Sequence, residues 1–176
     1  MDTFVLVEGI SDRIALETLA ARRGRDLESE GVTIVPMGGA HAIGRFLTRF
    51  AGMRVVGLCD EQERDVFLRA GMAPLAFEVC VEDLEDELIR ALGAEVVEDV
   101  LDANGHLDAF RTFQRQPAWR SKRVEAQLRR FLCASDRRKL RYARFLVDAA
   151  IDRNCVPSPL DAVLTQALNA SNTFTA

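Results

Sequence analysis

Acidic residues follow three apolar runs of this sequence, at positions where strands of a sheet would end. Glu8 follows the run at 4–7, Asp60 follows the run at 54–59, and Glu82, Asp83 and Glu85 follow the run at 75–81. In an open parallel sheet these ends lie along one edge, where α/β proteins place their ligand sites. Carboxylates gathered there repel one another, and more strongly as water is excluded. A divalent cation would make such a cluster tolerable, and all-oxygen ligands favour Mg²⁺ or Mn²⁺ over zinc.

The chemistry that this pattern predicts is hydrolysis of a phosphodiester. One or two hard cations held by carboxylates can activate a water molecule and stabilise charge that develops on a phosphate. Asp12, one helical turn beyond the first run, is placed to face the same crevice. Taken singly, Asp12 could instead be a helix cap and Glu8 a solvated strand end. The pair, together with the other acidic strand ends, favours a site.

Charge is distributed unevenly along the chain. The formal net charge is −4, but residues 60–108 hold 15 acidic and 3 basic residues, whereas residues 111–144 hold 12 basic and 2 acidic residues. An acidic centre beside a basic segment suits a metal-dependent enzyme that acts on a polyanion, and the basic segment could follow a phosphate backbone. Attraction between the two segments across an internal contact is the alternative. Trp119, beside Pro117, is expected to be a core or interface anchor rather than a platform on which bases stack.

The elements that must position these residues alternate between strand and helix. Strands are predicted at 4–7, 32–35, 54–59 and 75–81, with helices between them at 12–24, 41–50 and 61–70. This alternation indicates an α/β fold with a parallel sheet and helices on both faces. From residue 83 onward only helical spacing is found, at 84–92, 96–101, 110–116, 124–132, 140–151 and 160–168. Gly38 and Gly39 are predicted to form a plain turn, with a phosphate-binding loop as the alternative.

Composition narrows the class of protein. The chain has 176 residues, of which 48% are hydrophobic, so one domain with a real core is expected. No apolar run reaches the roughly 20 residues of a membrane span, and the N-terminus shows no secretory signal. The four cysteines form no CxxC pair. We therefore expect reduced thiols, no zinc site, no membrane association and a cytoplasmic location.

Three motifs, taken in order, resemble the Toprim domain: Val7-Glu8-Gly9-Ile10-Ser11-Asp12, Val35-Pro36-Met37-Gly38-Gly39 and Leu58-Cys59-Asp60. Among forms of the Toprim domain, these motifs are most similar to the form in the OLD (overcoming lysogenization defect) family of ATP-linked nucleases. The resemblance covers residues 4–90 well and 91–150 more loosely. It implies a Toprim-like (Rossmann-like), four-stranded, mainly parallel sheet flanked by helices. We expect this α/β core at residues 1–93 and a helical C-terminal extension at 94–176, packed on the core.

The resemblance also implies roles for single residues. Five acidic positions match the family's acidic motifs and are implied metal ligands: Glu8, Asp12, Asp60, Asp83 and Glu85. Glu8 matches the glutamate that serves as metal ligand or general acid/base. Lys139 resembles a late basic residue and would stabilise negative charge on the phosphate in the transition state. We therefore expect Glu8 and Lys139 to be catalytic.

One position departs from the family pattern. The second acid of the DxD motif is Gln62 here, and Glu63 is the residue that could replace it as a metal ligand. The resemblance implies a Mg²⁺- or Mn²⁺-dependent endonuclease that hydrolyses DNA, with RNA left open as substrate. The alternative is a catalytically weakened Toprim-fold module that binds nucleic acid or a partner ATPase. No Walker A motif is present, so we expect any ATPase to be a separate subunit.

Overall fold

The computed structural model describes residues 2–169 and contains the predicted parallel sheet. The strands are β1 (Thr3–Val7), β2 (Val32–Pro36), β3 (Arg54–Asp60) and β4 (Phe77–Cys80), in the order β2-β1-β3-β4. All three pairings are parallel, with Leu6 opposite Val35 on one side and Gly57 on the other. Strand β4 is shorter than predicted because residues 73–76 form a turn, closed by a hydrogen bond from the Ala76 N–H to the Ala73 carbonyl.

Nine α-helices are found among the described residues, and each predicted helix is present. They are α1 (Ile10–Arg22), α2 (Ile43–Arg49), α3 (Arg64–Arg69), α4 (Leu84–Leu92), α5 (Ala94–Ala103), α6 (Leu107–Gln114), α7 (Val124–Cys133), α8 (Asp136–Asp152) and α9 (Ser158–Asn169). Single turns of 3-10 helix at Ala40–Ala42 and Glu61–Glu63 lead into α2 and α3. The fold class predicted from the sequence is therefore confirmed.

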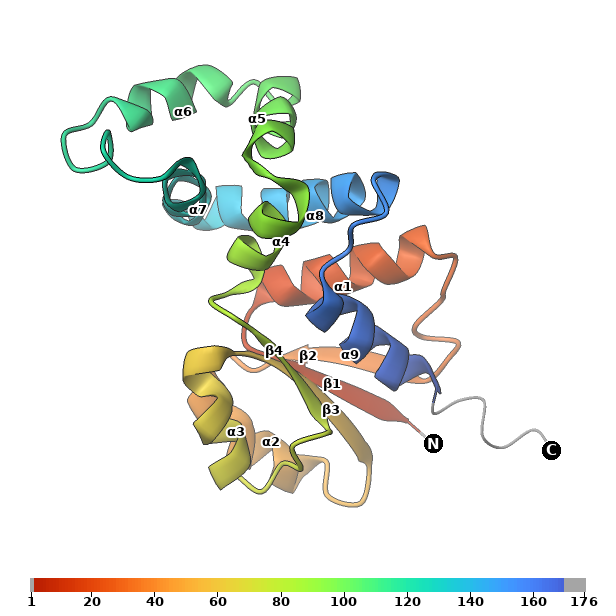
Figure 1. Cartoon of the computed structure of the whole chain (residues 1–176). Helices are drawn as coiled ribbons and strands as arrows, with labels where there is room; N and C mark the ends of the chain where they lie inside the picture. Colours follow the sequence, from red (N-terminus) through yellow and green to blue (C-terminus); the bar gives the residue numbers. More distant parts are fainter. Residues whose placement is uncertain (1, 170–176) are drawn as a thin grey trace.

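Helices cover both faces of the sheet, as a continuous apolar strand requires. On β1, Val5 and Val7 point into the core under α1 and α9, whereas Phe4 and Leu6 point to the opposite face. That second face is covered by α2 and α3, so the molecule has three layers at this end (Figure 1). The carboxyl ends of the strands, where the acidic residues lie, are between the two helical layers.

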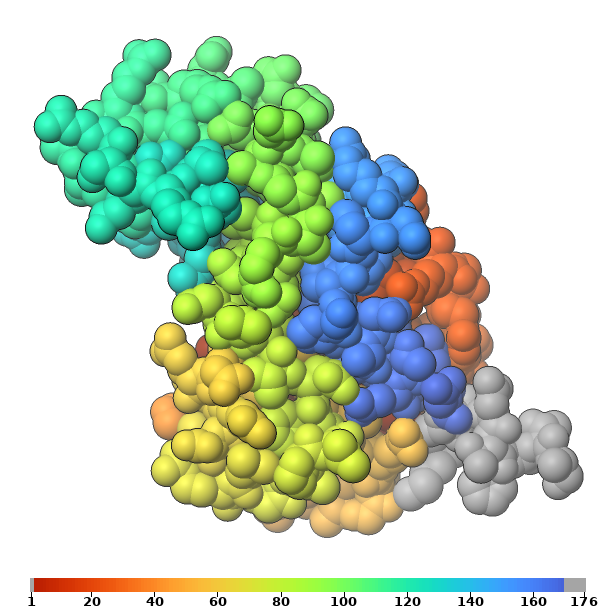
Figure 2. Space-filling view, in the orientation of Figure 1, coloured from red at the N-terminus to blue at the C-terminus, as the bar shows by residue number. Residues whose placement is uncertain are grey.

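The helices that follow β4 build outward and then return to the sheet. Helix α8 packs along α1, and α9 packs on β3 and β4. The segment from α5 to α7 forms a lobe that projects away from α2 and α3, seen in green and turquoise in Figure 2. Residues on both sides of position 93 share one hydrophobic core. The division into 1–93 and 94–176 stays a prediction.

Among the described residues, the structure has no helix with the length and apolar character that a membrane crossing demands.

A close approach of α3 to the sheet depends on Gly57, in the middle of β3. A Cβ atom at this position would lie 2.9 Å from Cε1 of Phe67 and 3.2 Å from Cβ of Phe77. Both neighbours are buried, at 0% and 5% exposure, so neither has free space to retreat into. Any larger residue at position 57 therefore forces α3 or β4 to shift.

We predict that Gly57→Ala destabilises the protein by about 1–3 kcal/mol, the usual cost of overpacking a core. Gly44→Ala is the matched control because a Cβ at position 44, in α2, meets no atom within 4 Å. It is expected to be neutral or to stabilise by about 0.4–1 kcal/mol. Thermal or urea denaturation of both variants measures the difference. Equal stability of the two variants would contradict the close packing at Gly57.

Candidate metal centre

Six of the seven predicted site residues meet in one crevice at the carboxyl edge of the sheet. The crevice has a volume of about 120 Å³ and is lined by Glu8, Gly9, Ser11, Asp12, Asp60, Asp83, Leu84, Glu85 and Lys139. These residues come from the ends of β1 and β3, the first turns of α1 and α4, and the first turn of α8. Glu63 does not line the crevice; it ends the 3-10 turn that follows Asp60.

Glu8 is fixed through its main chain by the turn after β2. The N–H groups of Gly38 and Gly39 both donate to the Glu8 carbonyl oxygen, at 3.0 and 3.2 Å. The two glycines adopt φ angles of 77° and 122°, in the region that residues with a side chain rarely occupy. Their N–H groups are therefore used inside the protein and are not available to a phosphate, so the plain turn is confirmed.

Asp12 has both of the roles considered for it. Its Oδ2 accepts a hydrogen bond of 2.8 Å from the Gly9 N–H, which closes the first turn of α1. The same carboxylate also lines the crevice. One oxygen therefore caps the helix, and the side chain still contributes negative charge beside Glu8 and Asp60.

Asp83 is held on both of its oxygens. Its Oδ1 accepts from the Asp86 N–H at 2.8 Å and so caps α4, while its Oδ2 accepts from Nε and Nη2 of Arg129 at 2.8 and 2.7 Å. Arg129 lies on α7, so the helical lobe supplies the counter-charge for this carboxylate. A metal ion that binds Asp83 must compete with that guanidinium.

Glu85 has an unusual environment for a carboxylate. Its residue exposure is 3%, and neither Oε1 nor Oε2 has a hydrogen-bond partner within the described part of the chain. The one cation beside it is Lys139, whose Nζ lies 3.5 Å from Oε2. Burying a charge with so little compensation is costly, and bound cations are a common reason for it.

Burial and mutual repulsion act together on these acids. Burial, followed by the charge of Glu8, raises the pKa of Asp60 to about 7. Burial raises the pKa of Asp12 to about 6 and that of Glu85 to about 7, although Lys139 opposes the second shift. The pKa of Glu8 is raised by burial and then by repulsion from Glu63. Asp60 and Glu85, with pKa values of about 7, therefore retain part of their protons near neutral pH unless a cation replaces them.

The donor set fits a hard divalent cation. Carboxylates from four segments line the crevice, and Glu85 offers two oxygens that accept no hydrogen bond. Ligand atoms of Asp83, Glu85 and Cys133 lie within 4.8 Å of one another. Burial raises the pKa of the Cys133 thiol to about 11, so sulfur stays protonated and is a poor ligand for Mg²⁺ or Mn²⁺.

Sequence reasoning missed two residues at this centre, Arg129 and Cys133. Arg129 was one of many arginines in the basic segment, and nothing in its neighbours marks it as the partner of Asp83. Cys133 is separated from Asp83 by 50 positions, so only the packing of α7 on α4 brings them together. Helical spacing from Arg129 to Cys133, four residues apart, is the one signal that they share a face.

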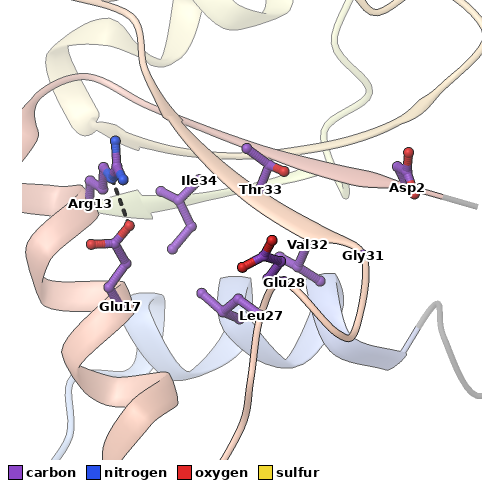
Figure 3. Close-up of a pocket in the computed structure, with 9 residues that line it drawn as sticks. All are labelled: Asp2, Arg13, Glu17, Leu27, Glu28, Gly31, Val32, Thr33 and Ile34. Carbon is purple, nitrogen blue, oxygen red and sulfur yellow. Dashed lines mark hydrogen bonds and ion pairs between the residues drawn. The ribbon is translucent and has the colours of Figure 1, made fainter.

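A larger pocket lies away from the acidic crevice, beside the outer edge of β2. It has a volume of about 550 Å³, and Arg13, Glu17, Leu27 and Ile34 are among the residues that line it (Figure 3). Arg13 and Glu17 form an ion pair with each other at 2.6 Å. This pocket has no convergent group of carboxylates, so its size alone does not indicate chemistry.

Residues 1–61 match the family model described as overcoming lysogenization defect protein-like, TOPRIM domain. A comparison with curated protein sequences gave no match. Among solved structures, the C-terminal region of the Burkholderia pseudomallei OLD protein matches with a TM-score of 0.68 and 16% identity, over 96% of this chain and 98% of that chain. The C-terminal region of the Xanthomonas campestris pv. campestris OLD protein matches with a TM-score of 0.66 and 21% identity, over 96% and 93%. At these identities the structural likeness shows the fold alone. The chain is therefore similar to the TOPRIM domain of OLD-like proteins over residues 1–61, and its fold resembles that of the C-terminal region of OLD proteins.

Proposed function

We propose that the chain is a Mg²⁺- or Mn²⁺-dependent endonuclease that hydrolyses DNA phosphodiester bonds. The observation that carries this proposal is Glu85, which is buried in a crevice lined by acids and accepts no hydrogen bond on either carboxylate oxygen, with Lys139 as the one cation beside it. Structural acids are normally satisfied by hydrogen bonds or ion pairs. The resemblance of residues 1–61 to the OLD-like TOPRIM domain supports the same function.

In this proposal each residue of the crevice has a defined task. One or two cations, held by Glu8, Asp12, Asp60, Asp83 and Glu85, would lower the pKa of a water molecule and offset charge on the phosphate. Glu8, whose pKa is raised, is suited to take up and return a proton at its carboxylate. Lys139 keeps its positive charge because neighbouring carboxylates, Glu85 first, outweigh the effect of burial on its pKa. Its ammonium group would face the phosphate.

A second candidate is a Toprim-fold module that binds nucleic acid or a partner ATPase without cleaving DNA. Gln62 favours it, because an amide replaces the second acid of the DxD motif and the side chain is exposed. Arg129 and Lys139 favour it as well, since they already compensate Asp83 and Glu85. Metal binding separates the two candidates: the nuclease requires a cation, and the module does not.

We predict that Mn²⁺ stabilises the protein more at pH 8 than at pH 6. The pKa of Asp60 in the folded protein is raised to about 7, above the ordinary aspartate pKa of 3.8. The stability that the protonated group contributes is therefore lost as the pH rises from the ordinary pKa through the raised one. Metal-free protein is therefore less stable at pH 8, where the charged carboxylates repel one another. Mn²⁺ removes that repulsion and has fewer protons to displace at the higher pH. Thermal unfolding with and without millimolar Mn²⁺ measures both effects.

Asp60→Asn tests the same prediction, because it should change the stability of the metal-free protein and the stabilisation by Mn²⁺ in opposite directions. It should raise the melting temperature of metal-free protein at pH 8, by about 2–4 °C for each kcal/mol of repulsion removed, and weaken the response to Mn²⁺. Asp65→Asn, an exposed change on α3, is the control. No response of the wild-type protein to Mn²⁺ at either pH would favour the binding module.

We predict that the wild-type protein nicks supercoiled plasmid in the presence of Mn²⁺. Glu8→Ala combined with Asp60→Ala should abolish nicking, because both changes remove ligands from the crevice. Lys139→Ala should lower the rate by about 10²–10³-fold, the usual effect of removing one group that stabilises transition-state charge. Gel electrophoresis of the nicked and supercoiled forms measures the rate.

Asp65→Asn is again the control for nicking, since it removes an acid that does not line the crevice. Cleavage that persists in the double variant would exclude this site. A wild-type protein that binds Mn²⁺ but nicks neither plasmid nor RNA would leave metal binding intact and contradict the nuclease.

A further inference from the structure

A groove opens directly beside the acidic crevice, on the face of α7. It has a volume of about 310 Å³ and is lined by Asp83, Trp119, Ala126, Arg129, Arg130 and Cys133. Asp83 lines both the groove and the crevice, so the two border the same side chain. Anything that occupies the groove is therefore held next to the candidate metal centre.

Trp119 forms an aromatic wall of this groove. Its ring packs against Phe113, with centroids 5.3 Å apart, and Phe113 in turn packs on Phe131 at 5.7 Å. The residue is half-buried, so the indole is supported from behind while it still borders the groove. The anchoring role expected for Trp119 is present, and the groove gives the residue a second surface to use.

The loop that carries Trp119 is tied down by one buried amide. Gln127, at 5% exposure, donates from Nε2 to the carbonyl oxygens of Trp119 and Lys122, at 2.8 and 3.1 Å. Its Oε1 accepts a hydrogen bond of 2.7 Å from Gln114 on α6. A polar loop between two helices is thereby fixed at its centre, so the indole is positioned before any ligand arrives.

The charge of the groove is positive. Arg129 is balanced by Asp83 and lies 3.6 Å from Glu82, whereas no carboxylate in residues 2–169 forms an ion pair with Arg130. Arg130 is exposed and lies one residue further along α7. Its guanidinium is therefore free to bind a phosphate on the same wall as Trp119.

We propose that this groove binds an unpaired nucleotide of a DNA strand, with the base stacked on Trp119 and the phosphate on Arg130. A bulky aromatic face beside a free guanidinium is the combination that single-strand binding sites use, because every base has a stacking face. The groove volume is at the lower end of the range for small-ligand sites, which suits one nucleotide. The inference rests on the proposed function, since it places a substrate strand beside the same carboxylates, and it defines that substrate as unpaired at this point.

The test uses intrinsic fluorescence, because Trp119 is the only tryptophan of the chain. The full chain is titrated with single-stranded oligothymidine in EDTA, where no cleavage takes place. We expect saturable quenching of the Trp119 emission. A duplex of the same length at equal nucleotide concentration should quench it less, because its bases are already paired and stacked.

Matched variants assign the effect to the groove. Arg130→Ala should weaken the binding of oligothymidine about fivefold or more, whereas Arg69→Ala, an exposed change on α3 across the sheet, should leave it unchanged. Trp119→Ala has no tryptophan emission, so its binding is measured by anisotropy of a labelled oligothymidine and should also be about fivefold weaker or more. Circular dichroism confirms that each variant is folded.

Three results would overturn the inference: no quenching at saturating oligothymidine, equal quenching by the duplex, or equal weakening by Arg130→Ala and Arg69→Ala. These outcomes are separate from the outcome of the nicking assay. A protein that nicks plasmid without quenching keeps the proposed function and loses the groove. A protein that shows quenching but does not nick keeps the groove as a binding site.

Discussion

Repulsion among carboxylates that are partly withdrawn from water governs the energetics of the sheet's carboxyl edge. β1 and β3 are paired neighbours, so the acids that follow them, Glu8 and Asp60, are brought together by the sheet itself. Burial and the neighbouring charges raise the pKa of Asp60 to about 7, which means that the fold holds this group in an unfavourable state when it is ionised. Stability is given up here in favour of an arrangement that can receive a cation.

The helical part of the chain supplies the positive charge that the sheet edge lacks. Arg129 on α7 binds Asp83, and Lys139 on α8 lies beside Glu85. Further out, Arg111 on α6 pairs with Glu98 on α5 at 2.7 Å. The acidic and basic halves of the sequence therefore do attract each other across internal contacts, as the simpler interpretation of the charge pattern held. Other cations, such as Arg130, have no such partner in the described residues, and a surface charge remains for a polyanion.

The strands and the meeting of the acids at one edge of the sheet could be predicted, because they depend on local patterns and on the topology of a parallel sheet. Runs of apolar residues mark strands buried on both faces, and their ends must share an edge. What could not be predicted are contacts made by the helices after residue 83, since helical spacing fixes which face is buried but not which partner covers it. Arg129 and Cys133 belong to this class, and Lys139 was named through family resemblance rather than from its own neighbours. The turn at 73–76 delays the start of β4 to Phe77, and the apolar residues around this turn hid it from prediction.

Helix α9 returns to the sheet after the whole helical lobe has been built, and this closes the chain on itself. The backbone oxygen of Gln166 accepts from Arg54 on β3 at 2.9 Å, and its side-chain amide donates to Glu78 on β4. The segment between α4 and α9 is thereby anchored to the sheet at both of its ends. Opening of α9 would remove one of those anchors, and because α8 is joined to α9 through residues 153–157, the loosening would extend to the helix that bears Lys139. The last helix shares one hydrophobic core with α1, α4 and α8, which line the crevice, although no residue of α9 lines it.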